Sequence, residues 1–83
     1  MYNIEFEPEA LKFFKKQDKL IQKRIGKKIE SLKQNPEIGK PLTGKLSGLW
    51  SLRIGDYRTI YQIKNNELIV LVLKIGHRKN IYS

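Results

Sequence analysis

The sequence predicts a small α+β domain in which a two-helix antiparallel hairpin packs on a mostly antiparallel sheet. Three observations carry this prediction. An alternating apolar segment opens the chain, two segments with helical spacing of apolar residues follow it, and three strand-like segments joined by very short turns close it. With 83 residues, the chain has room for one modest core, so we expect a single domain over residues 1–83.

The N-terminal strand is predicted over residues 2–7, "YNIEFE", where Tyr2, Ile4 and Phe6 alternate with polar side chains. Such alternation is typical of a half-buried strand. Pro8 follows, and proline suits the first turn of a helix because the N–H that it lacks has no helical partner there. We therefore expect the first helix to begin at Pro8, in the segment "PEALKFFKKQ".

The second helix is predicted to begin after Asp18, whose carboxylate can cap the free N–H groups of the first turn. Its apolar residues recur at helical spacing: Ile21, Ile25, Ile29 and Leu32. Gly26 lies inside this helix and costs about 1 kcal/mol relative to alanine, so we expect close packing there. Residues 35–36, Asn-Pro, end the helix, and the following "PEIGKPLTGKLSG" is predicted as a loop.

The first hairpin of the predicted C-terminal meander joins "LWSLRI" to "YRTIYQI". Gly55 and Asp56 lie between them, a pair typical of a two-residue type II′ turn. This turn sets Arg53 directly opposite Arg58. Two arginines in that position repel each other unless an anion lies over them. The pair therefore indicates a phosphate site on this face of the sheet.

The second hairpin adds "ELIVLVLKI" after two asparagines at 65–66, which tolerate the backbone of a type I′ turn. We expect a register that pairs Lys64 with Glu67 and Arg58 with Leu73. One face of the meander is then apolar, and we expect the helices to cover it: Trp50, Leu52, Ile54, Tyr57, Tyr61, Val70 and Val72. The other face is mixed: Ser51, Arg53, Arg58, Ile60, Gln62, Leu71 and Leu73. The last residues, 76–83, are expected to cover part of that second face.

Composition limits the function. The formal net charge is +9, from 17 Lys and Arg against 8 Asp and Glu, which favours a polyanionic or acidic partner. A basic ribosomal or chromosomal protein also fits these totals. The chain has no cysteine, its longest apolar run covers only residues 68–73, and its N-terminus carries acids where a signal peptide carries bases. We therefore expect a soluble, cytoplasmic protein with no membrane partner.

The C-terminal segment "IGHRKNIYS" concentrates basic groups and a phenol, and it holds the only histidine of the chain. A solvated basic tail is one reading of this segment. A site that binds phosphate and transfers protons is the other.

The segments "LSGLWSLRIGDYRTIYQI" and "VLKIGHRKNIY" resemble the RelE family of toxins from toxin–antitoxin pairs. The resemblance covers nearly the whole chain and implies the RelE/ParE fold. It also implies a type II toxin that cleaves messenger RNA in the ribosomal A site without a metal or other cofactor. The implied partners are the ribosome, with its mRNA and rRNA, and a cognate antitoxin that silences the toxin.

The resemblance also implies roles for individual residues. Arg58 of "DYRTIY" matches a family arginine that contacts the scissile phosphate, and Arg78 of "GHRK" matches a second catalytic arginine. Tyr82 corresponds to a family tyrosine near the C-terminus. His77 is our further candidate for proton transfer, because its unperturbed pKa lies near neutrality.

Four further residues are predicted to bind RNA: Arg53, Ser51, Lys45 and Lys79. Arg53 falls at or near a basic position of the family, whereas Ser51 stands where some relatives carry a lysine. Lys79 also has a plainer reading as a solvated charge, as do Arg78 and His77. Tyr82 also has a plainer reading, as a ring that only packs on the edge of the sheet.

RNA cleavage through the 2′-hydroxyl needs a base, an acid and a group that stabilises the phosphorane charge. A metal route needs clustered carboxylates, but the C-terminal half offers only Asp56 and Glu67, each in a predicted turn. The arginines are therefore the predicted phosphate ligands, and no metal site is predicted. A tyrosine has an ordinary pKa near 10, so neighbouring arginines would have to lower it before it acts as a base.

Two alternatives to a nuclease stay open at this point. A ParE-like inhibitor of DNA gyrase shares the fold but performs no chemistry, and a basic RNA-binding module has only a structural role. The set of Arg58, Arg78 and Tyr82 separates them, because only a nuclease requires all three.

Overall fold

The computed structural model describes residues 1–81, so Tyr82 and Ser83 lie outside the described part of the chain. Two helices are present, α1 (Pro8–Lys16) and α2 (Lys19–Glu30). One sheet contains β1 (Asn3–Phe6), β2 (Lys40–Pro41), β3 (Trp50–Ile54), β4 (Tyr57–Lys64) and β5 (Ile69–His77). The strand order is β1-β5-β4-β3-β2, with β1 parallel to β5 and every other pair antiparallel. The predicted α+β class is confirmed.

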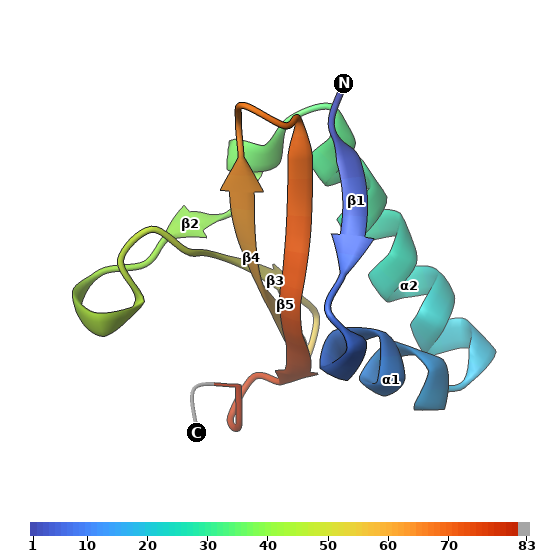
Figure 1. The fold of residues 1–83 in the computed structure, drawn as a ribbon. Helices are drawn as coiled ribbons and strands as arrows, with labels where there is room; N and C mark the ends of the chain where they lie inside the picture. The colour runs from blue at the N-terminus through green and yellow to red at the C-terminus, as the bar shows by residue number, and fades with distance from the viewer. Residues whose placement is uncertain (82–83) are drawn as a thin grey trace.

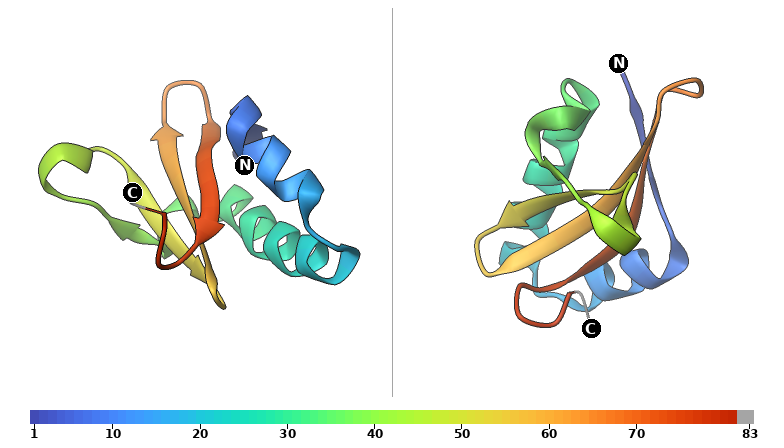
Figure 2. Two further views of the ribbon diagram at one scale, coloured as in Figure 1. Left: turned by 90° about the horizontal axis from the view of Figure 1, so that it is seen from below. Right: turned by 90° about the vertical axis from the view of Figure 1, so that its left-hand side faces the viewer.

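The two sides of the sheet are unequal. Figure 1 shows both helices on one side, while the loop between β2 and β3 and the turn after β5 extend on the other. The two views of Figure 2 show the same arrangement from other directions. We call the first side the helix face and the second the open face. Neither helix is long and apolar enough to span a membrane, and no other helix within residues 1–81 is.

The helices begin where the sequence predicts. Pro8 occupies the first position of α1. The Asp18 carboxylate accepts a hydrogen bond of 2.9 Å from the Ile21 backbone N–H and so caps α2. At its other end α2 continues into a single 3-10 turn, η1 (Ser31–Lys33).

The core lies between the helices and the helix face. Its fully buried residues come from α1, α2, η1 and the three meander strands, with Tyr61, Val70 and Val72 at the centre of the sheet. Trp50 and Tyr57 pack against this cluster from the same face. The predicted assignment of residues to the helix face is confirmed.

The second hairpin differs from the prediction. Lys64 pairs with Ile69, so the turn contains four residues rather than two, and the predicted pairing of Lys64 with Glu67 is wrong. The Glu67 N–H donates to the Lys64 carbonyl oxygen inside the turn, at 3.2 Å. Leu68 takes a φ of 55°, a left-handed conformation that a leucine seldom adopts. Nothing in a leucine side chain signals that conformation, which is why the sequence suggested the shorter turn.

A bulge adds a further shift between β4 and β5. Tyr61 pairs with Val72 but Ile60 pairs with Lys74, so Leu73 is the extra residue on β5. Together the longer turn and the bulge place Gly76 opposite Arg58. The predicted pairing of Arg58 with Leu73 is therefore wrong by three positions.

The stretch predicted as a loop contains regular structure. It begins with a 3-10 turn, η2 (Pro36–Ile38), continues through the short edge strand β2, and holds a second 3-10 turn, η3 (Gly44–Leu46). Two residues of strand, one of them a proline, give too little pattern for prediction from sequence. Proline is nevertheless compatible with an edge strand, because only one side of such a strand is hydrogen-bonded.

We expect Gly26→Ala to stabilise the domain by up to about 1 kcal/mol, since alanine favours the helix interior. A Cβ at this position would lie 3.7 Å from the Phe14 ring, which is ordinary contact. The close packing expected from the sequence therefore leaves room for one methyl group. Urea denaturation measures the change. Gly55→Ala is the contrasting variant, because Gly55 has a φ of 60° and an alanine there is strained; equal effects of the two would contradict the explanation.

Candidate functional site

Arg58 and Arg53 lie side by side on the open face. The register pairs them directly, as the Gly55 turn predicts. Arg58 is partly buried and its Nη1 donates to the Ser51 hydroxyl at 3.2 Å, while Arg53 is exposed and its Nε donates to the Gly55 carbonyl oxygen at 3.4 Å. Two guanidinium groups are thus held side by side on adjacent strands of the open face.

Ser51 is buried, whereas a residue that contacts RNA directly is expected to be exposed. Only 3% of its surface is exposed, and its hydroxyl accepts the hydrogen bond from Arg58. A serine in this position leaves space over β3 and orients the neighbouring guanidinium. The structure therefore gives Ser51 a contact with Arg58, and both residues lie at the same place on the open face.

A pocket of about 250 Å³ opens over these residues and is called here the open-face pocket. It is lined by Ile38, Gly39, Lys40, Ser51, Leu52, Arg53 and Arg58. Among these residues are three cations and no carboxylate, so the pocket suits an anion. Lys40 was missed in the sequence because β2 was not predicted; the Pro41 that follows it was the only available signal for an edge strand.

A tight approach at Gly39 holds β2 and η2 against the sheet. A Cβ on Gly39 would overlap the Ser51 carbonyl oxygen and would lie 2.6 Å from the Tyr61 hydroxyl oxygen. That hydroxyl donates to the Pro36 carbonyl oxygen at 2.6 Å. Burial raises the pKa of Tyr61 to about 12, with the hydrogen bond from the Gly39 backbone acting in the opposite direction. Gly39, which lines the open-face pocket, thus packs against a buried, neutral phenol.

We expect the folded domain to lose stability as the pH rises from 10 to 12. In that range the unfolded Tyr61, with a pKa of 10.0, has lost its proton while the folded one keeps it, so the free energy of unfolding falls. The loss attributable to Tyr61 reaches about 3 kcal/mol. Tyr61→Phe is the control, because it removes this phenol and leaves every other ionisable group in place. Between pH 10 and pH 12, the free energy of unfolding of this variant should fall by about 3 kcal/mol less than that of the parent. An equal fall in both proteins would contradict the assignment.

The tail turns back onto the open face. Residues 78–81 form turns: the Arg78 N–H donates to the Asp56 carbonyl oxygen and the Asn80 N–H to the His77 carbonyl oxygen, each at 2.9 Å. Ile81 is buried, and its Cδ1 would lie 3.3 Å from a Cβ on Gly76, which is opposite Arg58. The expected cover of the open face by the tail is confirmed for these residues. β5 itself continues through His77, so the turns of the tail begin at Arg78.

His77 lies on the other side of the sheet. It pairs with Tyr57, their ring centroids are 4.7 Å apart, and Phe13 of α1 packs edge-on against it at 6.5 Å. Neighbouring residues of a strand face opposite sides, so Arg58 points away from this cluster. The structure therefore does not bring His77 together with Arg58.

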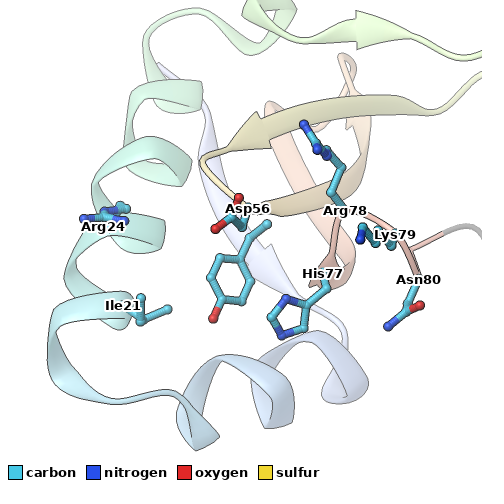
Figure 3. Close-up of a pocket in the computed structure, with 8 residues that line it drawn as sticks. Ile21, Arg24, Asp56, His77, Arg78, Lys79 and Asn80 are labelled. Atoms are coloured by element: carbon cyan, nitrogen blue, oxygen red, sulfur yellow. The ribbon is translucent and has the colours of Figure 1, made fainter.

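A second pocket, of about 520 Å³, lies where α2, the Gly55 turn and the tail meet; we call it the tail pocket. Its lining includes Arg24, Tyr57, His77, Arg78 and Lys79. Figure 3 shows the Arg78 side chain extending away from the His77 ring. Arg24 of α2 is a cation that the sequence analysis did not single out.

The remaining candidates are dispersed. Lys45 is exposed in η3, on the loop that extends from the open-face side in Figure 1. Tyr82 lies outside the described residues. Of the predicted residues, Arg53, Arg58 and Ser51 thus share one pocket, which Lys40 also lines, whereas Arg78, Lys79 and His77 line another.

Comparisons with known proteins agree with this fold. The sequence matches the family model described as the ParE toxin of type II toxin–antitoxin system, parDE, over residues 4–82. An Escherichia coli protein described as a RelE-like toxin is 34% identical over 83 residues, covering 94% of this chain and 84% of that protein. The mRNA interferase toxin RelE of Escherichia coli K12 is 28% identical and covers 99% of this chain, with 90% of its own length covered.

A solved structure shows the same architecture. The crystal structure of a RelBE toxin–antitoxin complex from Mycobacterium tuberculosis matches with a TM-score of 0.84 and 30% identity, covering 93% of this chain and 98% of that one. Fold, family match and relatives agree over nearly the full length of the chain. The chain therefore belongs to the RelE family of toxins, within the RelE/ParE superfamily of type II toxin–antitoxin systems.

Proposed function

We propose that this toxin is an endoribonuclease that cleaves messenger RNA in the ribosomal A site and needs no metal for the reaction. The observation that carries the proposal is the arginine pair on the open face, with Arg58 oriented by Ser51. A relative of 28% identity is named an mRNA interferase, which supports the same activity. Inhibition of translation follows from cleavage of the message.

The reaction is an attack of the 2′-oxygen on the adjacent phosphorus. The 2′-oxygen gains a bond to phosphorus and loses its proton to a base, while the bond to the 5′-oxygen breaks and that oxygen takes up a proton. The products are a 2′,3′-cyclic phosphate and a free 5′-hydroxyl. Arg58 stabilises the negative charge that builds up on the phosphorane oxygens, and Arg53 adds a second positive charge beside it.

Proton transfer is assigned by comparing two candidates. His77 packs in an aromatic cluster on the helix face, so we propose Tyr82 for this role, with Arg78 as a second phosphate ligand. We expect Tyr82→Phe, which removes only a hydroxyl, to slow single-turnover cleavage on programmed ribosomes by about a hundredfold or more. His77→Gln should cleave at nearly the parent rate. The reverse pattern would transfer the role to His77.

The proposed activity is tested by primer extension on a translated message after induction. New 5′ ends inside codons are expected when the message is translated, and none when its start codon is removed, because cleavage needs the ribosome. Unchanged messages together with arrested growth would overturn the proposal.

A ParE-like inhibitor of DNA gyrase is the competing candidate, and the description of the matching family model favours it. Gyrase supercoiling with the purified toxin separates the two. Inhibition of supercoiling without cleavage of any message would establish the competitor.

The proposed partner is a cognate antitoxin, as in the toxin–antitoxin complex that this fold matches. The net charge of +9 favours an acidic antitoxin. Leu71 and Leu73 on the open face are only partly buried, so they add apolar area for contact.

A further inference from the structure

Lys40 occupies a position on the open face that nothing in the family resemblance assigns. It pairs with Ser51 across β2 and β3, so its side chain lies on the same face as Ser51, Arg53 and Arg58. It also lines the open-face pocket with those residues. Three adjacent strands thus each contribute one cation to a single pocket.

The backbone under Lys40 is fixed while its side chain is free to adapt. Gly39 packs against the Ser51 carbonyl oxygen and the Tyr61 hydroxyl, and the Leu42 N–H donates to the Leu49 carbonyl oxygen at 2.8 Å just beyond β2. Lys40 itself is exposed. A long, flexible ammonium on a fixed strand suits a phosphate contact that tolerates different nucleotides.

The small side chain beside Lys40 keeps the space between the cations open. Ser51 is buried and lies between Lys40 and Ile60 in one row across the strands, whereas Arg53 and Arg58 form the next row, two residues along β3. Rows separated by two residues are about 7 Å apart. Lys40 on β2 and Arg58 on β4 are further separated by the intervening strand β3, so their backbones lie about 10 Å apart. Two long side chains that converge on the pocket from these strands can hold successive phosphates of one RNA strand.

We propose that Lys40 binds the phosphate next to the one held by Arg58, and so fixes the register of a single RNA strand across β2, β3 and β4. The inference rests on the proposed function for the identity of the strand as a message. Lys40 is a binding residue here and takes no part in proton transfer. Lys40 binds the substrate equally well before and during the reaction. Its loss therefore raises KM and leaves kcat unchanged.

The first experiment measures binding without cleavage. The parent, Lys40→Gln and Lys12→Gln are titrated with a short single-stranded RNA oligonucleotide at several salt concentrations. Lys12 is exposed on α1, on the helix side of the sheet, so its variant carries the same loss of charge away from the pocket. Lys40→Gln should weaken binding about threefold to tenfold and reduce the salt slope by about 0.7, as loss of one phosphate contact does.

The second experiment uses programmed ribosomes. Lys40→Gln should raise KM for cleavage and leave kcat near the parent value. In a further arm, the phosphate proposed to contact Lys40 is replaced in the message by a neutral methylphosphonate. This replacement should raise KM for the parent and leave KM for Lys40→Gln unchanged.

Two failures are distinguishable. If Lys40→Gln binds the oligonucleotide with the affinity and salt slope of Lys12→Gln, the inference about Lys40 is overturned, whether or not the parent cleaves RNA. If the parent binds RNA through Lys40 but cleaves no message on ribosomes, the proposed nuclease function fails while the binding site stands.

Discussion

Replacing Arg58 with alanine should abolish the toxicity of this protein while changing its free energy of unfolding by no more than about 1 kcal/mol. The variant loses the guanidinium that we propose as the phosphate ligand in the open-face pocket. It also loses one hydrogen bond to Ser51, whose net worth is about 1 kcal/mol, but it relieves the repulsion with Arg53. Removal of one preorganised charge from a transition state typically slows the reaction by about a hundredfold or more.

Growth after induction and single-turnover cleavage on programmed ribosomes measure this effect. Arg58→Lys is the informative companion, because it keeps the charge and loses the planar fork. It should recover only part of the activity if phosphate is bound through two N–H groups. Growth arrest by Arg58→Ala at equal expression would show that the site lies elsewhere.

Gly39→Ala should be the most destabilising of the small substitutions. The new Cβ would overlap the Ser51 carbonyl oxygen, which belongs to the backbone of β3, and would crowd the buried Tyr61 hydroxyl. Neither neighbour can move without breaking a strand or the hydrogen bond to Pro36. We expect a loss of about 3 kcal/mol or more, at the upper end for a single substitution.

Urea denaturation gives this loss directly, and Gly26→Ala is the matched control because the same methyl group has room there. The Gly39 variant should also weaken RNA binding, since β2 carries Lys40 and would be pushed away from β3. Stability equal to that of the parent would mean that β2 is not held by this contact.

The sequence was sufficient to predict the order of the elements and the first hairpin. Gly55 adopts without strain the positive φ that its turn requires. The pairing of Arg53 with Arg58 follows from that turn. The second hairpin was predicted wrongly because Leu68, rather than an asparagine, adopts the left-handed conformation. The extra residue at Leu73 is likewise invisible in an apolar run, since every residue there suits a strand.

The candidate site was predicted in part for the same reason. The resemblance and the first turn indicated Arg58, which the structure places in a cationic pocket. The face of His77 depends on the second hairpin, and the corrected register places its ring against Tyr57 instead of near Arg58. The place of Lys40 on the open face could not be predicted, because it follows from the pairing of a two-residue strand. That pairing is fixed by tertiary contacts at Gly39, and no local pattern reveals such contacts.

The parallel pairing of β1 with β5 determines when the domain can fold. Residues 3–6 hydrogen-bond with residues 69–72, so β1 cannot pair until β5 has been synthesised. Closing so long a stretch of chain costs entropy before any contact compensates for it, and contacts between distant residues slow folding. The central strand β5 also supplies Val70 and Val72 to the core and Gly76 to the space opposite Arg58. A nascent chain that still lacks β5 therefore has no closed core, and the domain completes its fold only after residues 69–77 have been synthesised.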